Sequence, residues 1–318
     1  MVFLRSWDDM KELQIRDSII KTLCYADVFE FPMNKNEIFK YYIGNKQVSA
    51  ISLSSVLNSM VKERIIDKLK GYYFLIGRKK LVGLRYKRQR VSHRKLVIAK
   101  RVSAFLARIP TVRFVGISGS LSMNNCRAED DIDLFIISSK NTLWITRLFV
   151  NLTLLALGNK RSRNDIFGAN LICPNMFLAE DNLEIPDEKK NLFSAHEVAQ
   201  LKPVINKGSA YEEFLLQNAW INNFIPNFKI ISKPPMIRKN TIYVHLSKTL
   251  NFVFYIPQRL YMLKKITKEE MDLNVARFHP KDKGKFACEL FNIKYKYYLE
   301  SLSRPAKNTA SIARDLYN

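Results

Sequence analysis

Two aspartates separated by one residue are the part of this sequence best suited to chemistry. Asp131 and Asp133 open the apolar run DIDLFII, which is typical of a buried strand. Side chains alternate along a strand, so both carboxylates point one way and Ile132 points the other. Carboxylates held together repel each other unless a cation lies between them, and hard oxygen ligands beside a phosphate select Mg²⁺ or Mn²⁺. The pair therefore predicts a site for one of these metals.

A second candidate feature lies just upstream. Gly119 and Ser120 follow the apolar run VRFVGI at 112–117, and a helix can begin after them. A strand that delivers a small Gly-Ser turn onto a helix start presents free backbone N–H groups and a hydroxyl to an anion. A triphosphate could bind at this turn.

The two features together resemble the signature of the DNA polymerase beta-like nucleotidyltransferase superfamily, in which Gly-Ser is followed by two aspartates flanking an apolar residue. Gly119, Ser120, Asp131 and Asp133 match position by position. The resemblance implies a mixed sheet with flanking helices, reaching from about residue 110 to 180. It implies that Gly119 and Ser120 hold the β and γ phosphates, that both aspartates bind divalent metals, and that the metals stabilise phosphoryl transfer.

The longer order of motifs is similar to a group of uncharacterised bacterial nucleotidyltransferase-domain proteins with an N-terminal winged helix. The motifs that carry this likeness are GYYFLIGR, GSLSM, DDIDLFII, TLWITR and FHP. The likeness covers most of the chain and implies no particular substrate.

A third carboxylate, which active members of the superfamily usually add from a later strand, is not evident. The natural candidate strand, ANLICPNMFL at 169–178, has Asn175 at its polar position. Pro174 would interrupt the strand ladder, as at an edge or a bulge, and an amide cannot act as a carboxylate base. The nearest acids are Asp165 and Glu180, and Glu197 is a more distant alternative that a structure can test.

Other polar and aromatic residues carry weaker signals. Arg147 and Arg161 could reach a phosphate, and Trp144 could stack on a base, although ordinary packing is the favoured interpretation. His196 and His279 have no second histidine or cysteine at ligand spacing, so a zinc site is not predicted.

The elements expected in residues 1–78 follow the order of a winged helix-turn-helix domain. Apolar spacing predicts helices at 16–26 and 52–64, and Asn34 with Glu37 three residues later marks the start of a helix between them. An aromatic strand follows the third helix. That helix has few cations for reading a major groove, so a packing or protein-interaction role is an equal alternative to DNA binding.

Positive charge is concentrated after this domain. The chain has 52 Lys and Arg against 29 Asp and Glu, a net charge of +23. Residues 78–101 contain no acid, and apolar residues interleave with the cations, so a basic amphipathic helix is expected within a connector at 79–109. Its cations could bind nucleic acid, whereas a solvated helix face is the alternative.

The remaining organisation follows from periodicity and composition. An α+β fold is expected, with a nucleotidyltransferase domain at 110–186 and a helical C-terminal region at 187–318. Four scattered cysteines favour a reducing cytoplasm. Neither a signal peptide nor a membrane-spanning run is apparent.

Three functions are compatible with these patterns. The leading hypothesis is a metal-dependent nucleotidyltransferase that moves a nucleoside monophosphate from a nucleoside triphosphate to an unidentified hydroxyl. The second is a catalytically degenerate regulator that senses nucleotide and binds DNA. The third is an RNA-modifying transferase whose substrate lies along residues 78–101.

Overall fold

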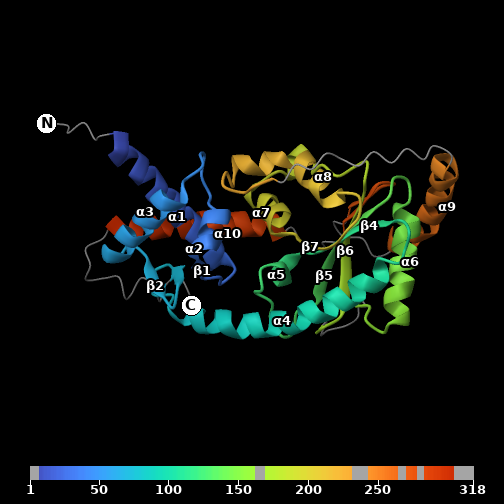
Figure 1. Ribbon diagram of the computed structural model, residues 1–318, viewed down its shortest axis with the longest axis horizontal. Coiled ribbons are helices and arrows are strands. Elements are labelled where there is room, and N and C mark those ends of the chain that lie inside the picture. Colours follow the sequence, from blue (N-terminus) through green and yellow to red (C-terminus); the bar gives the residue numbers. More distant parts are fainter. Residues whose placement is uncertain (1–6, 162–168, 231–242, 264–269, 278–282, 304–318) are drawn as a thin grey trace.

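The protein is a mixed α+β molecule with two sheets, which confirms the expected fold class at this level (Figure 1). The computed structural model describes residues 7–161, 169–230, 243–263, 270–277 and 283–303. Within these ranges, no helix is both long and apolar enough to cross a membrane.

The first sheet belongs to the N-terminal unit. Its elements are α1 (Trp7–Val28), β1 (Met33–Asn34), α2 (Lys35–Lys40), α3 (Ala50–Lys62), β2 (Asp67–Leu69) and β3 (Tyr72–Phe74). The expected capping box is present, because Glu37 N donates to the Asn34 side chain and Asn34 N donates to the Glu37 side chain. Lys70 and Gly71 form the two-residue turn between β2 and β3, both at positive φ, as such a hairpin turn requires. The strands pair antiparallel in the order β1-β3-β2.

The second sheet is mixed and lies at the centre of the molecule. Its strands are β4 (Val112–Ile117), β5 (Ile132–Ser138), β6 (Ile172–Ala179), β7 (Lys202–Asn206), β8 (Glu270–Met271) and β9 (Val275–Arg277), in the order β7-β4-β5-β6-β9-β8. Among these strands, β5 and β6 run parallel, and the other neighbouring strands pair antiparallel. Within the described residues, three of these strands come from the region after residue 187, where the sequence pattern is largely helical.

Helices cover both faces of this sheet. They are α4 (Lys80–Leu106), α5 (Gly119–Ser122), α6 (Leu143–Ala156), α7 (Leu192–Gln200), α8 (Ala210–Gln217), α9 (Tyr243–Leu263) and α10 (Lys283–Ser303), with short 3-10 turns at Asp187–Lys189 and Ala219–Asn223. Ile132, Leu134 and Ile136 share a core with α4, α6 and α9. Phe135 and Ile137 join the opposite core, which is built with the N-terminal unit, α7, α8 and α10. The strand alternation predicted for β5 is therefore confirmed.

Two long helices extend from the N-terminal unit toward the rest of the molecule. Helix α4 runs along one side from the N-terminal unit to the sheet, and α10 lies against α1 (Figure 1). The core that contains Phe135 extends from Ile19 of α1 to Phe291 of α10. The N-terminal unit thus shares one apolar core with the sheet.

Candidate functional site

Asp131 and Asp133 lie together at the start of β5, on the face that looks toward the N-terminal unit. Ligand atoms of Asp131, Asp133 and Cys173 all lie within 4.8 Å of one another. Burial raises the pKa of Asp133 to about 7, and repulsion from Asp131 adds to the shift. The pair therefore carries two negative charges only at an energetic cost, which a bound cation would offset.

Gly119 is packed directly against Asp133. Its φ is +61°, and a Cβ at this position would lie 2.6 Å from Asp133 Oδ2. Ser118 N donates to the Asp133 carbonyl at 3.1 Å, which holds the turn beside β5. Only glycine meets both requirements, because other residues rarely adopt this φ and their Cβ would displace the carboxylate. The closeness of the Gly-Ser turn and the aspartates, expected from their spacing, is present.

Ser120 is held by a residue whose role the sequence did not indicate. Its hydroxyl donates to Asp130 Oδ2 at 3.0 Å, and Asp130 Oδ2 also accepts from Arg127 N at 2.9 Å. The buried Lys95 of α4 donates through Nζ to the carbonyls of Ala128, at 3.0 Å, and of Asp130. These contacts fix the loop that precedes Asp131. The acidic run before β5 could have identified Asp130 as part of this loop's contacts, whereas no local sequence pattern identifies Lys95.

Strand β6 has a bulge where it passes the aspartates. Leu134 pairs with Pro174 and Phe135 pairs with Met176, so Asn175 is the extra residue. This confirms the expected interruption at Pro174 as a bulge, since β6 lies between β5 and β9. Bulges re-aim side chains, and here Asn175 Nδ2 donates to Asp133 Oδ1 at 2.7 Å.

Asn175 lies at the polar position of β6, the position at which a third carboxylate would be expected. Its Oδ1 atom is buried and has no hydrogen-bond partner among the described residues. On the same strand, burial raises the pKa of the Cys173 thiol well above its usual value. Cys173 therefore remains a thiol rather than the thiolate that binds soft metals.

Arg161 contributes a cation to the site. Its Nη1 atom donates to Asp131 Oδ2, so this arginine reaches the predicted metal ligand. Two other residues considered from the sequence, Asp165 and His279, lie outside the described residues.

A cavity of about 920 Å³ opens beside the aspartates. The sheet supplies Asp131, Asp133 and Asn175 to its lining, and α7 supplies His196 and Glu197. Glu197, which is distant in the sequence, thus lines the same cavity as the aspartates. Burial raises the pKa of its carboxyl, and the positive charge of Lys283 opposes this shift. The sequence offered no sign that α7 would reach this position.

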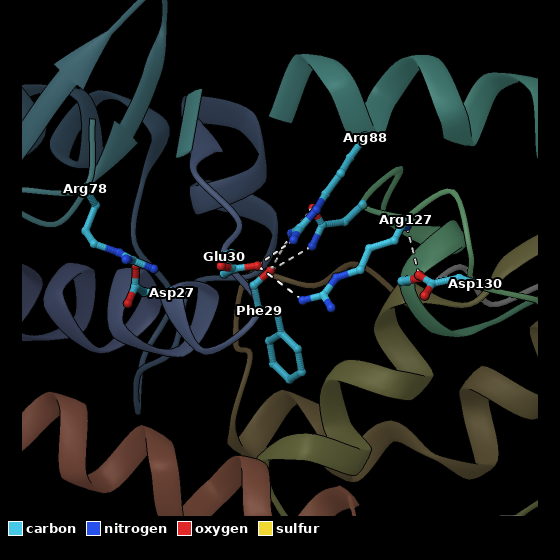
Figure 2. A network of polar contacts seen from close by, with 9 residues as sticks. Asp27, Phe29, Glu30, Arg78, Arg88, Arg127 and Asp130 are labelled. Atoms are coloured by element: carbon cyan, nitrogen blue, oxygen red, sulfur yellow. Dashed lines mark hydrogen bonds and ion pairs between the residues drawn. The ribbon is translucent and has the colours of Figure 1, made fainter. Parts of the chain in front are cut away.

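The basic stretch forms a helix, as expected, and its cations fall into two groups. The inner group is buried or half-buried and pairs with acids of the N-terminal unit: Arg78 with Asp27 at 2.6 Å, Arg85 with Glu37 at 2.6 Å, and Arg88 with Glu30 at 2.5 Å. Figure 2 shows Glu30 between Arg88 and Arg127, which joins the same carboxylate at 3.4 Å. The outer group is exposed along α4: Lys80, Lys87, Arg90, Arg94, Lys100 and Arg101. Part of the basic stretch therefore holds the site together instead of facing solvent.

Comparisons with protein-family models, with curated proteins and with solved structures give no match to this chain.

Proposed function

We propose that this protein is a metal-dependent nucleotidyltransferase that moves a nucleoside monophosphate from a nucleoside triphosphate to a hydroxyl. The nucleotidyltransferase-type domain would be residues 110–186, preceded by a winged helix in residues 1–78. The observation that carries the proposal is the close approach of Gly119 to Asp133. It brings a turn with free N–H groups beside a carboxylate pair, as phosphate and metal binding together require.

The donor groups fit Mg²⁺ or Mn²⁺. Asp131 and Asp133 would hold the metal, because both offer hard oxygen ligands. The buried Asn175 Oδ1 is a further oxygen without a partner among the described residues. When bound, a divalent cation would supply positive charge that offsets the negative charge developing during transfer.

The chain's own residues would orient the substrates and move the proton. The acceptor oxygen forms a bond to the α phosphorus while the bond to pyrophosphate breaks, and pyrophosphate leaves with that electron pair. Glu197 is the carboxylate proposed to take the hydroxyl proton, because it lines the same cavity as the aspartates and burial raises its pKa, which makes it a stronger base. Arg161 would pair with the triphosphate in place of Asp131.

Label transfer tests this proposal. The purified protein is incubated with each of four α-labelled nucleoside triphosphates, Mg²⁺ or Mn²⁺, and total cell extract. We expect label transfer by the wild type and none by the isosteric Asp131→Asn/Asp133→Asn variant. Absence of label transfer by the wild type would refute the proposal, and metal-dependent triphosphate binding without transfer would point to the second candidate below.

A degenerate, nucleic-acid-binding regulator is the second candidate. It is favoured by the exposed cations of α4 and by Asn175 in place of a third acid. Such a protein would bind nucleotide without transferring it, and its affinity for duplex DNA would fall steeply with salt. Replacing Lys87, Arg90, Arg94 and Arg101 with glutamine would flatten that salt dependence. Stronger binding to structured RNA than to duplex DNA would instead indicate an RNA-modifying transferase.

A further inference from the structure

The cavity beside the aspartates has an apolar end that the transfer chemistry does not explain. The N-terminal unit forms this end with Tyr25, Phe29, Phe31, Met33 and Tyr41. Figure 2 shows the ring of Phe29 directed away from the ion pairs, while its carbonyl accepts hydrogen bonds from Arg88 and Asn125. The polar network thus fixes the backbone of a residue whose ring faces the cavity.

His196 is a polar group that contacts the aromatic residues of this end. It is only 4% exposed, and its ring stacks on Tyr25 with centroids 4.1 Å apart. The Gln200 amide lies 3.1 Å from Nδ1 and donates to it, which assigns the ring proton to Nε2. Burial lowers the pKa of His196 to about 3, so the ring stays neutral.

Two buried polar atoms therefore lack partners in the same cavity wall. Among the described residues, neither His196 Nε2 nor Asn175 Oδ1 has a hydrogen-bond partner. One is a donor and the other an acceptor, and both side chains line the cavity. Buried polar groups are almost always paired in folded proteins, so two exceptions in one cavity indicate that bound groups pair with them there.

The size of the cavity limits what that ligand can be. Its volume of about 920 Å³ lies within the range of roughly 300–1,000 Å³ that is typical of small-molecule sites. The N-terminal unit forms its wall and shares a core with the sheet. A cavity of this size has room for small molecules but not for a duplex.

We propose that the apolar end of this cavity binds the acceptor substrate, a small molecule with a planar or apolar body and at least one hydroxyl. The body packs against Tyr25, Phe29 and Phe31, and an oxygen of the molecule accepts a hydrogen bond from His196 Nε2. The hydroxyl to be modified lies toward Glu197 and the aspartates. The identification of this ligand as the acceptor rests on the proposed transferase function, whereas the existence of the binding site does not.

Retention of small molecules tests the site without requiring turnover. The full-length protein is mixed with the fraction of a total cell extract below about 1 kDa, a limit set by ligand-cavity size, and no nucleotide is added. The protein is recovered by gel filtration, and the retained compounds are identified by mass spectrometry. We expect the wild type to retain a compound that carries a hydroxyl.

Two variants locate the bound compound. His196→Phe keeps a ring against Tyr25 and removes the Nε2 donor, together with the Nδ1 atom that accepts from Gln200. Retention should fall about three- to tenfold, as expected for one hydrogen bond lost to the ligand. Phe29→Ala should lower retention by at least as much, because it removes a ring from the wall. Phe149→Ala on α6 is the matched control, since both phenylalanines are partly exposed, at 40% and 49%, and Phe149 is not among the residues that line the cavity. Each variant must show cooperative unfolding.

The other possible results either overturn this inference or separate it from the proposed transferase function. The inference is overturned if the wild type retains nothing, if His196→Phe and Phe29→Ala retain as much as the wild type, or if nucleotides are the only retained compounds. Retention without any label transfer would remove the proposed function and leave the binding site. Transfer of label to protease- or nuclease-sensitive material, with no small molecule retained, would remove this inference alone.

Discussion

Gly119 can lie against Asp133 because glycine has no side chain, and the candidate site depends on this contact. A methyl group at residue 119 would meet Asp133 Oδ2 at 2.6 Å, and the backbone there is left-handed. Gly71 offers a matched comparison, because its φ is +83° and no atom lies within 4 Å of an added Cβ. Backbone strain and collision with the carboxylate can therefore be separated.

We expect Gly119→Ala and Gly71→Ala each to lower the free energy of unfolding by about 1–2 kcal/mol through backbone strain. Only Gly119→Ala should also abolish Mg²⁺-dependent triphosphate binding, because the added methyl moves a metal ligand. Urea unfolding and titration with Mg²⁺-triphosphate measure the two effects. Equal triphosphate affinity in both variants would show that the contact does not matter for binding.

The ionised carboxylate of Asp133 should destabilise the folded protein when no metal is bound. Its pKa in the folded protein, about 7, is above the ordinary value of 3.8, so ionisation destabilises the fold as pH rises through this interval. At pH 8 in EDTA, Asp133→Asn should be more stable than the wild type by about 1–4 kcal/mol. Added Mg²⁺ should raise the Tm of the wild type and leave that of the variant unchanged. A variant that is less stable than the wild type in EDTA would contradict this account.

His196 should make the folded protein less stable as the pH falls, whereas Asp133 makes it less stable as the pH rises. Its pKa falls from 6.5 to about 3 on folding because of burial, so the unfolded chain binds the extra proton as pH drops below 6.5. Between pH 7.5 and 5, the wild type should lose about 2 kcal/mol relative to His196→Phe. Urea unfolding of both proteins at the two pH values gives this difference, from which other titrating groups cancel. A difference that does not change with pH would mean that the pKa of His196 is the same in the folded protein as in the unfolded chain.

At the scale of elements, α4 acts through its inner cations. Arg85 is 2% exposed, pairs with Glu37 and lies 3.7 Å from the centre of the Phe31 ring. Lys87, two residues later, is exposed. The helix thus fastens the N-terminal unit to the loop that precedes Asp131.

Arg85→Met should lower the free energy of unfolding by about 3 kcal/mol, because it leaves Glu37 without its partner in a half-buried position. Lys87→Met should change it by no more than about 0.5 kcal/mol, as exposed substitutions usually do. Chemical denaturation of the two variants beside the wild type provides the measurement. Similar values for both would show that the buried pair adds little to stability.

The elements were predictable from the sequence to the extent that their signals are local. The apolar run at 112–117 is β4, the capping residues Asn34 and Glu37 start α2, and alternation places Asp131 and Asp133 on one face. The short strands β8 and β9 were not predicted, because two or three residues show no periodicity. They form because β9 pairs with β6 and β8 pairs with β9.

Only one part of the candidate site was predictable from the sequence, namely the Gly-Ser turn and the two aspartates. Gly119 and the aspartates are close in sequence as well as in space, whereas His196 and Glu197 reach the cavity because α7 packs on a core shared with the N-terminal unit. The burial of Arg85 and Lys95 was also missed, since their partners are a distant carboxylate and backbone carbonyls. Neither kind of partner leaves a pattern around the cation.

At the scale of the whole molecule, one core joins the N-terminal unit, the sheet, α7 and α10. The N-terminal unit and the sheet should therefore unfold together, although the sequence patterns predict two separate domains. We expect a single calorimetric transition in which the calorimetric and van't Hoff enthalpies agree. Two resolved transitions would show that the shared core is too weak to couple the two parts.

The pairing of α10 with α1 has a consequence for biosynthesis. Asp27 of α1 is buried and binds Lys294 of α10 at 2.6 Å, and Tyr298 of α10 donates to the Ile65 carbonyl at 2.6 Å. These partners are translated more than two hundred residues apart, so the growing chain on the ribosome must carry the apolar face of α1 uncovered until α10 emerges. Nascent chains with exposed apolar surface are prone to aggregate and are bound by chaperones. Ribosomes stalled before codon 283 should therefore hold a chaperone-bound chain, and its release should follow the synthesis of α10.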